Sequence, residues 1–269
     1  MSVAHICGAT MSRLHDGRYA IIPDLQVPFH DKRALDHVCS WLASGNFDGI
    51  LNVGDESDSP NVSRWNKASA MEYAPVLDKH LTETHKVMRR LSEAVGWAKP
   101  HHVMRSNHAD RLEKYIARYA PALHVLKPLK WEAMMGYGQP STLTGDTLPI
   151  TFHRQVWEFA PGWVLAHGDE GRLSQVPGST ALGLAKKFGR SLVCGHTHRA
   201  GVQHLTMGFN GRATVTLTGV EVGNLMDMRS ASYLGGGSGN WRQAVAVATI
   251  KGRVCDVTLK LLHNGQVVG

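Results

Sequence analysis

The chain has 269 residues, a formal net charge of +7 with its histidines neutral, and a composition that is 43% hydrophobic and 19% charged. These values are those of an ordinary globular protein with one large domain or two small ones. No apolar stretch approaches the roughly 18–20 residues of a membrane helix, and the N-terminal region has no signal-peptide core, so we expect a cytoplasmic protein without a membrane partner. The positive charge favours an anionic partner, which leaves nucleic acid, nucleotide and phosphoprotein open.

Apolar runs that end in polar residues predict the first strands. They cover residues 18–24, 48–55, 101–108, 162–169 and 190–198. Helical patterns lie between them at 31–44, 76–95, 109–119 and 179–188. This alternation of strand and helix predicts an α/β fold with a largely parallel region.

The pattern changes after residue 198. Strand-like runs occur at 200–209, 212–221, 242–250 and 253–262, and the turns FNGR and KGR join the first two and the last two. Consecutive strands with tight turns indicate an antiparallel sheet in the C-terminal third of the chain.

The ends of the first predicted strands carry side chains with oxygen and nitrogen donors. They are Asp24, Gln26, Asp55, Asn107, His108, His167, His196 and His198. Because the carboxyl ends of parallel strands meet at one edge of a sheet, we expect these side chains to converge. A set of carboxylate, amide and imidazole donors without thiolate suits Mn²⁺, Fe or Zn²⁺, and Mg²⁺ less readily.

Two pairs in this set stand two residues apart, Asp24 with Gln26 and His196 with His198. On an extended backbone each pair would point to the same side. The amide oxygen of Gln26 could bind an ion directly, reach it through water, or only form a hydrogen bond to another ligand.

Five short segments, DLQ at 24–26, GDESD at 54–58, NH at 107–108, HGDE at 167–170 and GHTH at 195–198, resemble the calcineurin-like metallophosphoesterases in type and order. The resemblance spans residues 20–200. The segment 220–247 resembles, more loosely, the phage-encoded branch with enzymes of the 2′,3′-cyclic nucleotide phosphodiesterase type, which implies the host cytoplasm. The implied fold is a four-layer α/β/β/α sandwich of two mixed β-sheets flanked by helices, with the metal site at the strand C-terminal ends.

The resemblance also implies roles for these residues. Asp24, Asp55 and His198 would bind one divalent ion, and Asp55, Asn107, His167 and His196 a second, with Gln26 as a candidate ligand of the first. Mn²⁺ is favoured, with Fe, Zn²⁺ and Mg²⁺ as alternatives. A metal-bound hydroxide would attack phosphorus, His108 would protonate the leaving group as general acid, and Asp58 would orient the His108 ring.

The chain departs from the family pattern at two positions. Ser106 stands where the family has glycine, and Gln26 stands where it has histidine. Because an amide oxygen is a weaker and harder donor than imidazole, we predict a labile first site that prefers Mn²⁺ over Zn²⁺.

Several other residues are weaker candidates. His30, Arg172 and Arg199 could contact substrate, with a surface turn as the alternative for His30 and solvated charge as the alternative for the arginines. Arg111 is predicted to brace the cluster. Four tryptophans could stack on a nucleobase, although core packing is favoured for each: Trp65, Trp131, Trp157 and Trp241.

We predict a single metallophosphoesterase domain, 1–269, with cap or specificity insertions at 59–100 and 129–160. The leading functional hypothesis is hydrolysis of small phosphodiesters or nucleotides such as 2′,3′-cyclic nucleotides. A DNA or RNA nuclease of the same superfamily is the first alternative, so nucleic acid remains a candidate partner. A non-catalytic scaffold with this fold is the second. The sequence leaves the oligomeric state open.

Overall fold

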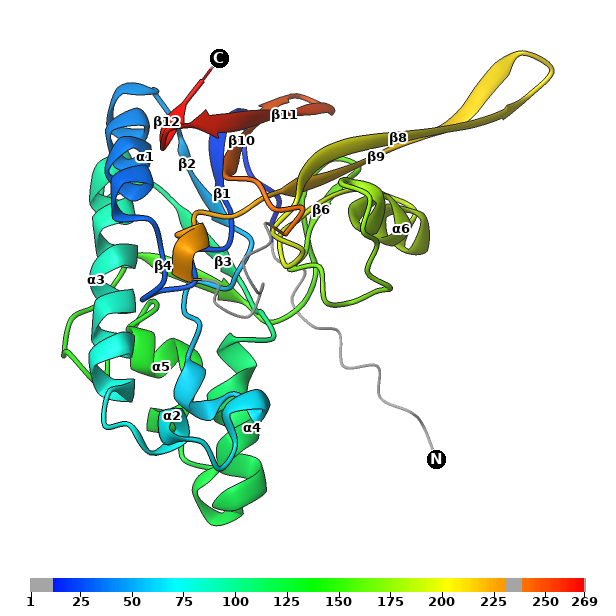
Figure 1. Cartoon of the computed structure of the whole chain (residues 1–269). Helices are drawn as coiled ribbons and strands as arrows, with labels where there is room; N and C mark the ends of the chain where they lie inside the picture. The colour runs from blue at the N-terminus through cyan, green and yellow to red at the C-terminus, as the bar shows by residue number, and fades with distance from the viewer. Residues whose placement is uncertain (1–11, 231–238, 269) are drawn as a thin grey trace, which may run out of the picture.

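The computed structural model describes residues 12–230 and 239–268 (Figure 1). Two β-sheets pack against each other, and helices cover their outer faces. The larger sheet has the strand order β12-β11-β10-β1-β2-β3-β4, and the smaller has the order β5-β6-β7-β9-β8. The predicted four-layer α/β/β/α sandwich of two mixed sheets is therefore confirmed.

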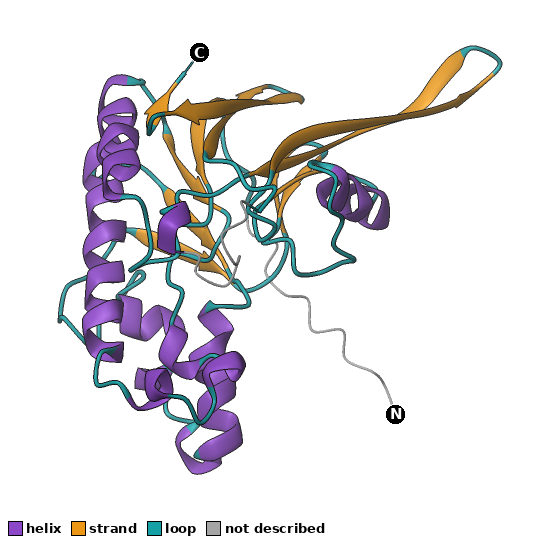
Figure 2. Ribbon diagram, in the orientation of Figure 1, coloured by secondary structure: helices purple, strands orange, loops and turns teal. Residues whose placement is uncertain are grey.

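The seven-stranded sheet has a parallel half and an antiparallel half (Figure 2). The parallel strands are β1 (Gly17–Ile22), β2 (Gly49–Asn52), β3 (His101–Met104) and β4 (Ile150–His153). The antiparallel strands are β10 (Ala244–Lys251), β11 (Val254–His263) and β12 (Gln266–Val267). Since β10 pairs in antiparallel fashion with β1, it begins at the edge where β1 ends.

The five-stranded sheet is parallel at its centre and antiparallel at both edges. Its strands are β5 (Trp157–Ala160), β6 (Trp163–Leu165), β7 (Ser191–Cys194), β8 (Ala200–Phe209) and β9 (Arg212–Val222). The prediction of one antiparallel sheet in the C-terminal third was wrong in one respect, because its hairpins belong to different sheets. The β8–β9 hairpin extends the smaller sheet away from the body of the protein, and β10–β11 extends the larger one.

The helices separate into two outer layers. They are α1 (Lys32–Ser44), α2 (Ala70–Tyr73), α3 (Leu77–Val95), α4 (Ala109–Tyr119), α5 (Trp131–Met135) and α6 (Ser179–Phe188). Short 3₁₀ turns occur at Pro60–Val62, Arg64–Asn66, Pro121–Leu123, Lys127–Leu129 and Met228–Ser230. α1 and α3 lie over the larger sheet and α6 over the smaller. Among the described helices, none is long and apolar enough to cross a bilayer.

Three apolar clusters hold the layers together. Met88 and Leu91 of α3 pack with Ile22 and Ile50 in the cluster beneath the helices, and all four are inaccessible to solvent. A second cluster fills the space between the sheets, and a third lies under α6. Burial of this apolar surface is the main force that fixes the sheets and brings their strand ends together.

The segment 129–160, predicted as a cap or specificity insertion, contributes one strand to each sheet. β4 forms an edge of the larger sheet and β5 an edge of the smaller, and Trp131 of α5 is only 1% exposed. The 150–160 end of this segment therefore belongs to the sheets.

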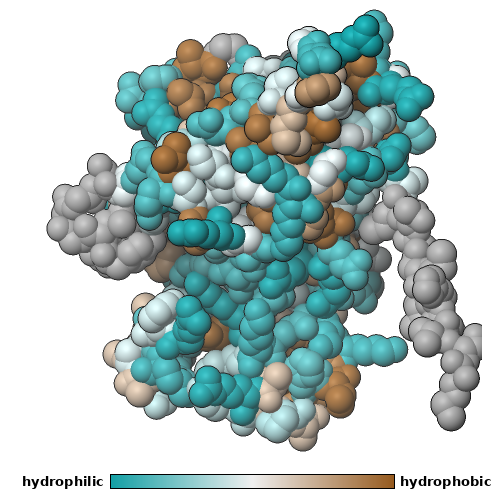
Figure 3. Space-filling view, turned by 90° about the vertical axis from the view of Figure 1, so that its right-hand side faces the viewer, coloured by the Kyte–Doolittle hydropathy of each residue, from teal (hydrophilic) through white to brown (hydrophobic). Residues whose placement is uncertain are grey.

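The face seen in Figure 3 mixes hydrophilic side chains with separate hydrophobic patches, as is usual for a protein surface.

Candidate metal centre

The structure brings predicted ligands together in two groups that share one carboxylate. Asp24, Asp55 and His198 form one group, and Asp55, His167 and His196 form the other. Within each group the ligand atoms lie within 4.8 Å of one another. These residues follow β1, β2, β6 and β7, so the convergence arises at the carboxyl ends of strands from both sheets.

Main-chain hydrogen bonds hold the loops that carry these residues. The amides of Leu25 and Gln26 both donate to the carbonyl oxygen of Asp55, at 3.1 and 2.9 Å. The amide of His196 donates to Oδ2 of Asp24 at 2.8 Å. The loops after β1, β2 and β7 are therefore fastened to one another.

Four residues of the predicted set adopt left-handed backbone conformations. The φ angles are 55° at Gln26, 52° at Asp55, 65° at His196 and 57° at His198. The extended-backbone argument for the two pairs was therefore wrong, and the loops place these side chains by tight turns. Left-handed conformations at residues other than glycine cost free energy and gather at functional sites, which suits a centre that the surrounding fold holds in place.

Two glycines make the close approach of the loops possible. A Cβ atom on Gly195 would lie 2.1 Å from Oδ1 of Asp24, and one on Gly54 would lie 2.8 Å from Cβ of Ser106. Ser106 itself has an ordinary negative φ, and its Oγ accepts a hydrogen bond from the amide of Ala109 at 3.1 Å. The departure from glycine at this position is therefore accommodated, and the serine hydroxyl binds the amide of the first residue of α4.

The two predicted amide ligands also reach the cluster. Oδ1 of Asn107 lies 2.9 Å from Nε2 of His167. Nε2 of Gln26 donates to Oδ2 of Asp55 at 2.9 Å and lies 3.3 Å from Nε2 of His198. Oε1 of Gln26 is buried and has no hydrogen-bond partner in the described part of the chain. Rotating the side-chain amide of Gln26 by 180° would exchange its nitrogen and oxygen and point Oε1 at the cluster. Direct binding of an ion by Gln26 therefore stays a prediction.

Two buried carboxylates dominate the electrostatics. Burial, followed by the charge of Asp55, raises the pKa of Asp24 well above its usual value. Burial also acts to raise the pKa of Asp55, but His108, His167 and His196 outweigh it and hold this pKa well below the usual value. Burial opposes charge on His167, yet the nearby Asp55 raises its pKa to about 10. The surrounding imidazoles therefore favour the ionised form of Asp55, whereas burial and the charge of Asp55 favour the protonated form of Asp24.

The donor chemistry fits divalent cations. Burial lowers the pKa of both His196 and His198 to about 4, so both rings are neutral, as metal-binding imidazoles must be. His167, whose pKa is raised, would have to release a proton when it binds an ion. Oδ1 of Asp24 is buried and unpartnered among residues 12–230 and 239–268. Nε2 of His198 lies 3.3 Å from Oδ2 of Asp24, and Nε2 of His167 lies 3.4 Å from Oδ1 of Asp55. These separations match the ~3 Å between adjacent ligand atoms of an ion whose bonds are near 2.1 Å.

His108 lies beside the shared carboxylate. Its Nε2 is 3.7 Å from Oδ2 of Asp55, and its Nδ1 is 3.2 Å from Oδ1 of Asp58. Arg111 lies 2.7 Å from the same Nε2 and donates to the carbonyl oxygen and carboxylate of Asp58. Since a guanidinium only donates, Nε2 accepts here and the ring proton is on Nδ1, facing Asp58. Arg111 thus braces this group as the sequence predicted.

The three weaker candidates lie outside the two donor groups. His30 is only 6% exposed, so the surface-turn alternative was wrong and the ring offers little surface to a substrate. Arg172 is exposed in the loop after His167. The guanidinium of Arg199 donates to the carbonyl oxygen of Thr197 in its own loop and to Oε1 of Gln175 in the loop before α6.

Two supporting residues escaped the sequence analysis. Glu221 is fully buried in β9, and its carboxylate accepts hydrogen bonds from Oγ1 of Thr197 at 2.9 Å and from the amide of Thr180 at 2.8 Å. Nδ2 of Asn224 donates to the carbonyl oxygen of His198 at 3.0 Å. Both fasten the loop that carries the histidines. For Glu221, the sequence feature that could have indicated a buried supporting role was a lone acid in the apolar run GVEV.

We expect Gln26→His to bind the first ion roughly tenfold more tightly than the wild type, with a larger gain for Zn²⁺ than for Mn²⁺. The reason is that imidazole is a stronger, softer donor than an amide oxygen. Calorimetric titration with each metal measures the change, with Gln266→His as the control because Gln266 is exposed on β12 and distant in sequence from every predicted ligand. Equal affinities in wild type and variant would refute the assigned role of Gln26.

These features define a class: an α/β protein of two packed mixed sheets, with paired acid–histidine donor groups at the strand ends. The chain is 33% identical over 252 residues to the gene 54 protein of Mycobacterium phage D29, a match that covers 93% of this chain and 95% of the relative. It is 32% identical over 253 residues to the gene 54 protein of Mycobacterium phage L5, with the same coverage. The chain therefore belongs to the family of mycobacteriophage gene 54 proteins.

More distant likenesses exist among solved structures. Vps29 of Cryptosporidium parvum is 14% identical with a TM-score of 0.46, and the match covers 94% of this chain and 96% of that one. A protein of Streptococcus pneumoniae titled a predicted phosphoesterase is 12% identical with a TM-score of 0.38, over 95% and 97% of the two chains. With TM-scores below 0.5, these likenesses carry no argument about the activity. No protein-family model matches the chain.

Proposed function

We propose that the chain is a dinuclear metal-dependent phosphoesterase that hydrolyses phosphodiesters, with small nucleotides such as 2′,3′-cyclic nucleotides as substrates. The observation that carries this proposal is the sharing of Asp55 between two donor groups. A buried carboxylate between two sets of acid and histidine donors suits a pair of neighbouring cations. Such pairs are typical of enzymes that cleave phosphate esters.

The chain would hold the ions with residues from five loops. Asp24, Asp55 and His198 would hold one ion and Asp55, Asn107, His167 and His196 the other, with Gln26 as an additional oxygen donor to the first. When bound, two divalent cations supply Lewis-acid activation of a phosphate and of a water molecule. Mn²⁺ is the proposed metal because every donor is oxygen or imidazole nitrogen.

His108 and the residues around it would protonate the leaving group. His108 borders the shared carboxylate, where it can give a proton to the departing oxygen of a bound ester. Asp58, 3.2 Å from Nδ1, would fix the orientation of the ring. Because Arg111 contacts Nε2, it must release that nitrogen before His108 can donate from it.

A hydrolysis panel with added Mn²⁺ tests the proposal. The panel contains bis(p-nitrophenyl) phosphate, p-nitrophenyl phosphate, 2′,3′- and 3′,5′-cyclic nucleotides, and single- and double-stranded nucleic acid. We expect turnover of the diesters to exceed that of the monoester, with 2′,3′-cyclic nucleotides hydrolysed best. Chelation of the metal should abolish all of these activities.

The alternatives predict other outcomes of the same panel. Cleavage of nucleic acid without hydrolysis of cyclic nucleotides would assign a nuclease, which the net charge of +7 permits. No turnover of any ester with Mn²⁺, Fe²⁺, Zn²⁺ or Mg²⁺ would contradict an enzymatic role and favour a scaffold.

A further inference from the structure

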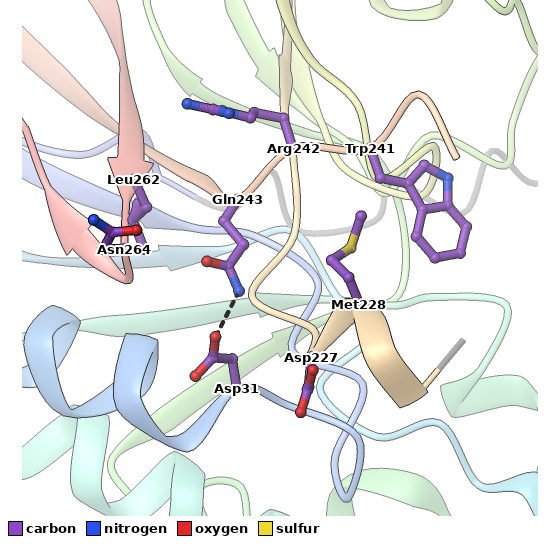
Figure 4. A pocket seen from close by; sticks show the side chains of 8 residues that line it. All are labelled: Asp31, Asp227, Met228, Trp241, Arg242, Gln243, Leu262 and Asn264. Atoms are coloured by element: carbon purple, nitrogen blue, oxygen red, sulfur yellow. Dashed lines mark hydrogen bonds between the residues drawn. The ribbon is translucent and has the colours of Figure 1, made fainter. Parts of the chain in front are cut away.

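The acids that line a pocket of about 320 Å³ at the start of α1 already have partners within the chain (Figure 4). Asp31 accepts a hydrogen bond from Gln243 at 3.0 Å, and Asp227 forms an ion pair with Arg229 at 2.8 Å. A surface with more unused bonding capacity lies on the β8–β9 hairpin, which projects from the body of the protein (Figure 1).

β8 is an edge strand of the smaller sheet. It pairs with β9 on one side, and no described strand pairs with its other side. Its ten residues, Ala200–Phe209, include no Lys, Arg, Asp, Glu or Pro. Edge strands commonly carry such residues, which discourage pairing with another strand. The free edge of β8 therefore presents main-chain hydrogen-bonding groups without this protection.

The outer half of the hairpin exposes apolar side chains that continue a buried row. Leu205 and Leu217 stand opposite each other and pack in the cluster under α6. The next pair outward on the same face is Met207 with Val215, and these side chains are 48% and 37% exposed. Phe209, near the turn, is 79% exposed. Because a two-stranded hairpin is only marginally stable in water, a further strand would stabilise this arm.

A second apolar patch lies at the base of the hairpin. A Cβ atom on Gly201 would lie 2.5 Å from Cβ of Pro177, so these residues are packed together. The neighbouring Val176 is 55% exposed. Gly201 stands opposite Glu221, whose carboxylate accepts hydrogen bonds from amides at the start of α6. The patch therefore lies on the same face of the sheet as Met207, six residues further along the strand.

The charge distribution favours a second copy of the chain over nucleic acid as the occupant of this edge. From residue 200 to residue 220 the only Lys, Arg, Asp or Glu is Arg212, although 19% of the whole chain is charged. Binding of a phosphate backbone takes several Lys and Arg side chains, which this arm lacks. Two copies with a net charge of +7 could meet along an uncharged edge without placing like charges in contact.

We propose that the chain forms a twofold-symmetric dimer in which the β8 edges of two copies pair in antiparallel fashion, with Met207 of each copy opposite Gly201 of the other. The pairing uses the regular part of the strand, which ends where the register shifts between Met207 and Gly208. Residues that face each other across an antiparallel pair share one face of the sheet. Met207 of one copy would thus cover Val176 and Pro177 of the other, and the symmetry repeats the contact. The inference does not depend on the proposed function.

Sedimentation velocity of the full chain over a range of concentrations tests the dimer. We expect the wild type at micromolar concentration to have twice the 29.4 kDa mass of the chain. Met207→Lys and Val176→Glu should each raise the dimer dissociation constant roughly tenfold or more, because each places two charges in an apolar contact. Both substitutions in one chain should recover most of the affinity, because the new positive charge of each copy then meets the new negative charge of the other.

Val125→Glu is the matched control and should leave the dissociation constant unchanged. Val125 is 77% exposed and follows α4, which lies at the opposite end of the molecule from the hairpin. Circular dichroism and Mn²⁺ titration of each variant check that the fold and the metal centre persist. A wild type that stays monomeric would overturn the proposal, and so would a dimer that neither Met207→Lys nor Val176→Glu weakens. No recovery in the double variant would refute the contact between the tip of one arm and the base of the other.

Discussion

Replacing Asp55 with asparagine is expected to remove high-affinity binding of both metal ions and to lower phosphodiester turnover by on the order of 10³-fold or more. Asp55 is the one residue present in both donor groups. Its side chain is 1% exposed and is the acceptor for Gln26, so the substitution exchanges a buried charge for an amide of the same shape. Metal analysis after equilibrium dialysis measures the number of bound ions, and the hydrolysis panel measures turnover.

Single substitutions elsewhere in the centre should separate the two sites. Asp24→Asn is expected to weaken only the site with His198, and His196→Asn only the site that it shares with His167. Asp256→Asn is the control for loss of one acid, because Asp256 is exposed on β11. If Asp55→Asn still bound two ions with wild-type affinity, the shared-carboxylate arrangement would be wrong.

The layered fold was largely predictable because its signals are local. The helix boundaries at 77–95, 109–119 and 179–188 agree with the predicted segments to within a residue. The predicted strand ends ran too far, since β1 stops at Ile22 and β7 at Cys194. An apolar run followed by a polar residue marks a strand, but hydrogen bonds to neighbouring strands decide where it ends, and those partners are distant in sequence.

The supporting parts of the centre were less predictable for the same reason. Which polar residues gather at the sheet edge follows from the positions of the strands. The left-handed turns at Gln26 and His198, by contrast, depend on bonds to loops after other strands. The support from Glu221 comes from β9, whose pairing with β7 no local pattern indicates. Tertiary contacts, and not propensities, fix these details.

Replacing His108 with asparagine is expected to lower turnover of cyclic nucleotides by about 10²–10⁴-fold while both ions remain bound, because general acids typically contribute that much. His108 belongs to neither donor group, and its ring lies against Asp58. The loss should be much smaller for bis(p-nitrophenyl) phosphate, because p-nitrophenolate departs without needing a proton. The measurement is the ratio of kcat values for the two substrates in wild type and variant.

This ratio separates proton delivery from a structural role. Loss of a merely structural contact would depress both reactions alike or release metal, whereas loss of an acid acts through the leaving group. His204→Asn is the matched control, because His204 is exposed on β8 and bonds to Thr218. Arg111→Lys adds a second comparison: it keeps a positive charge but loses the planar fork that contacts both Asp58 and His108, so turnover should fall less than in His108→Asn. An unchanged ratio in His108→Asn would assign the leaving-group proton to water or to another residue of the centre.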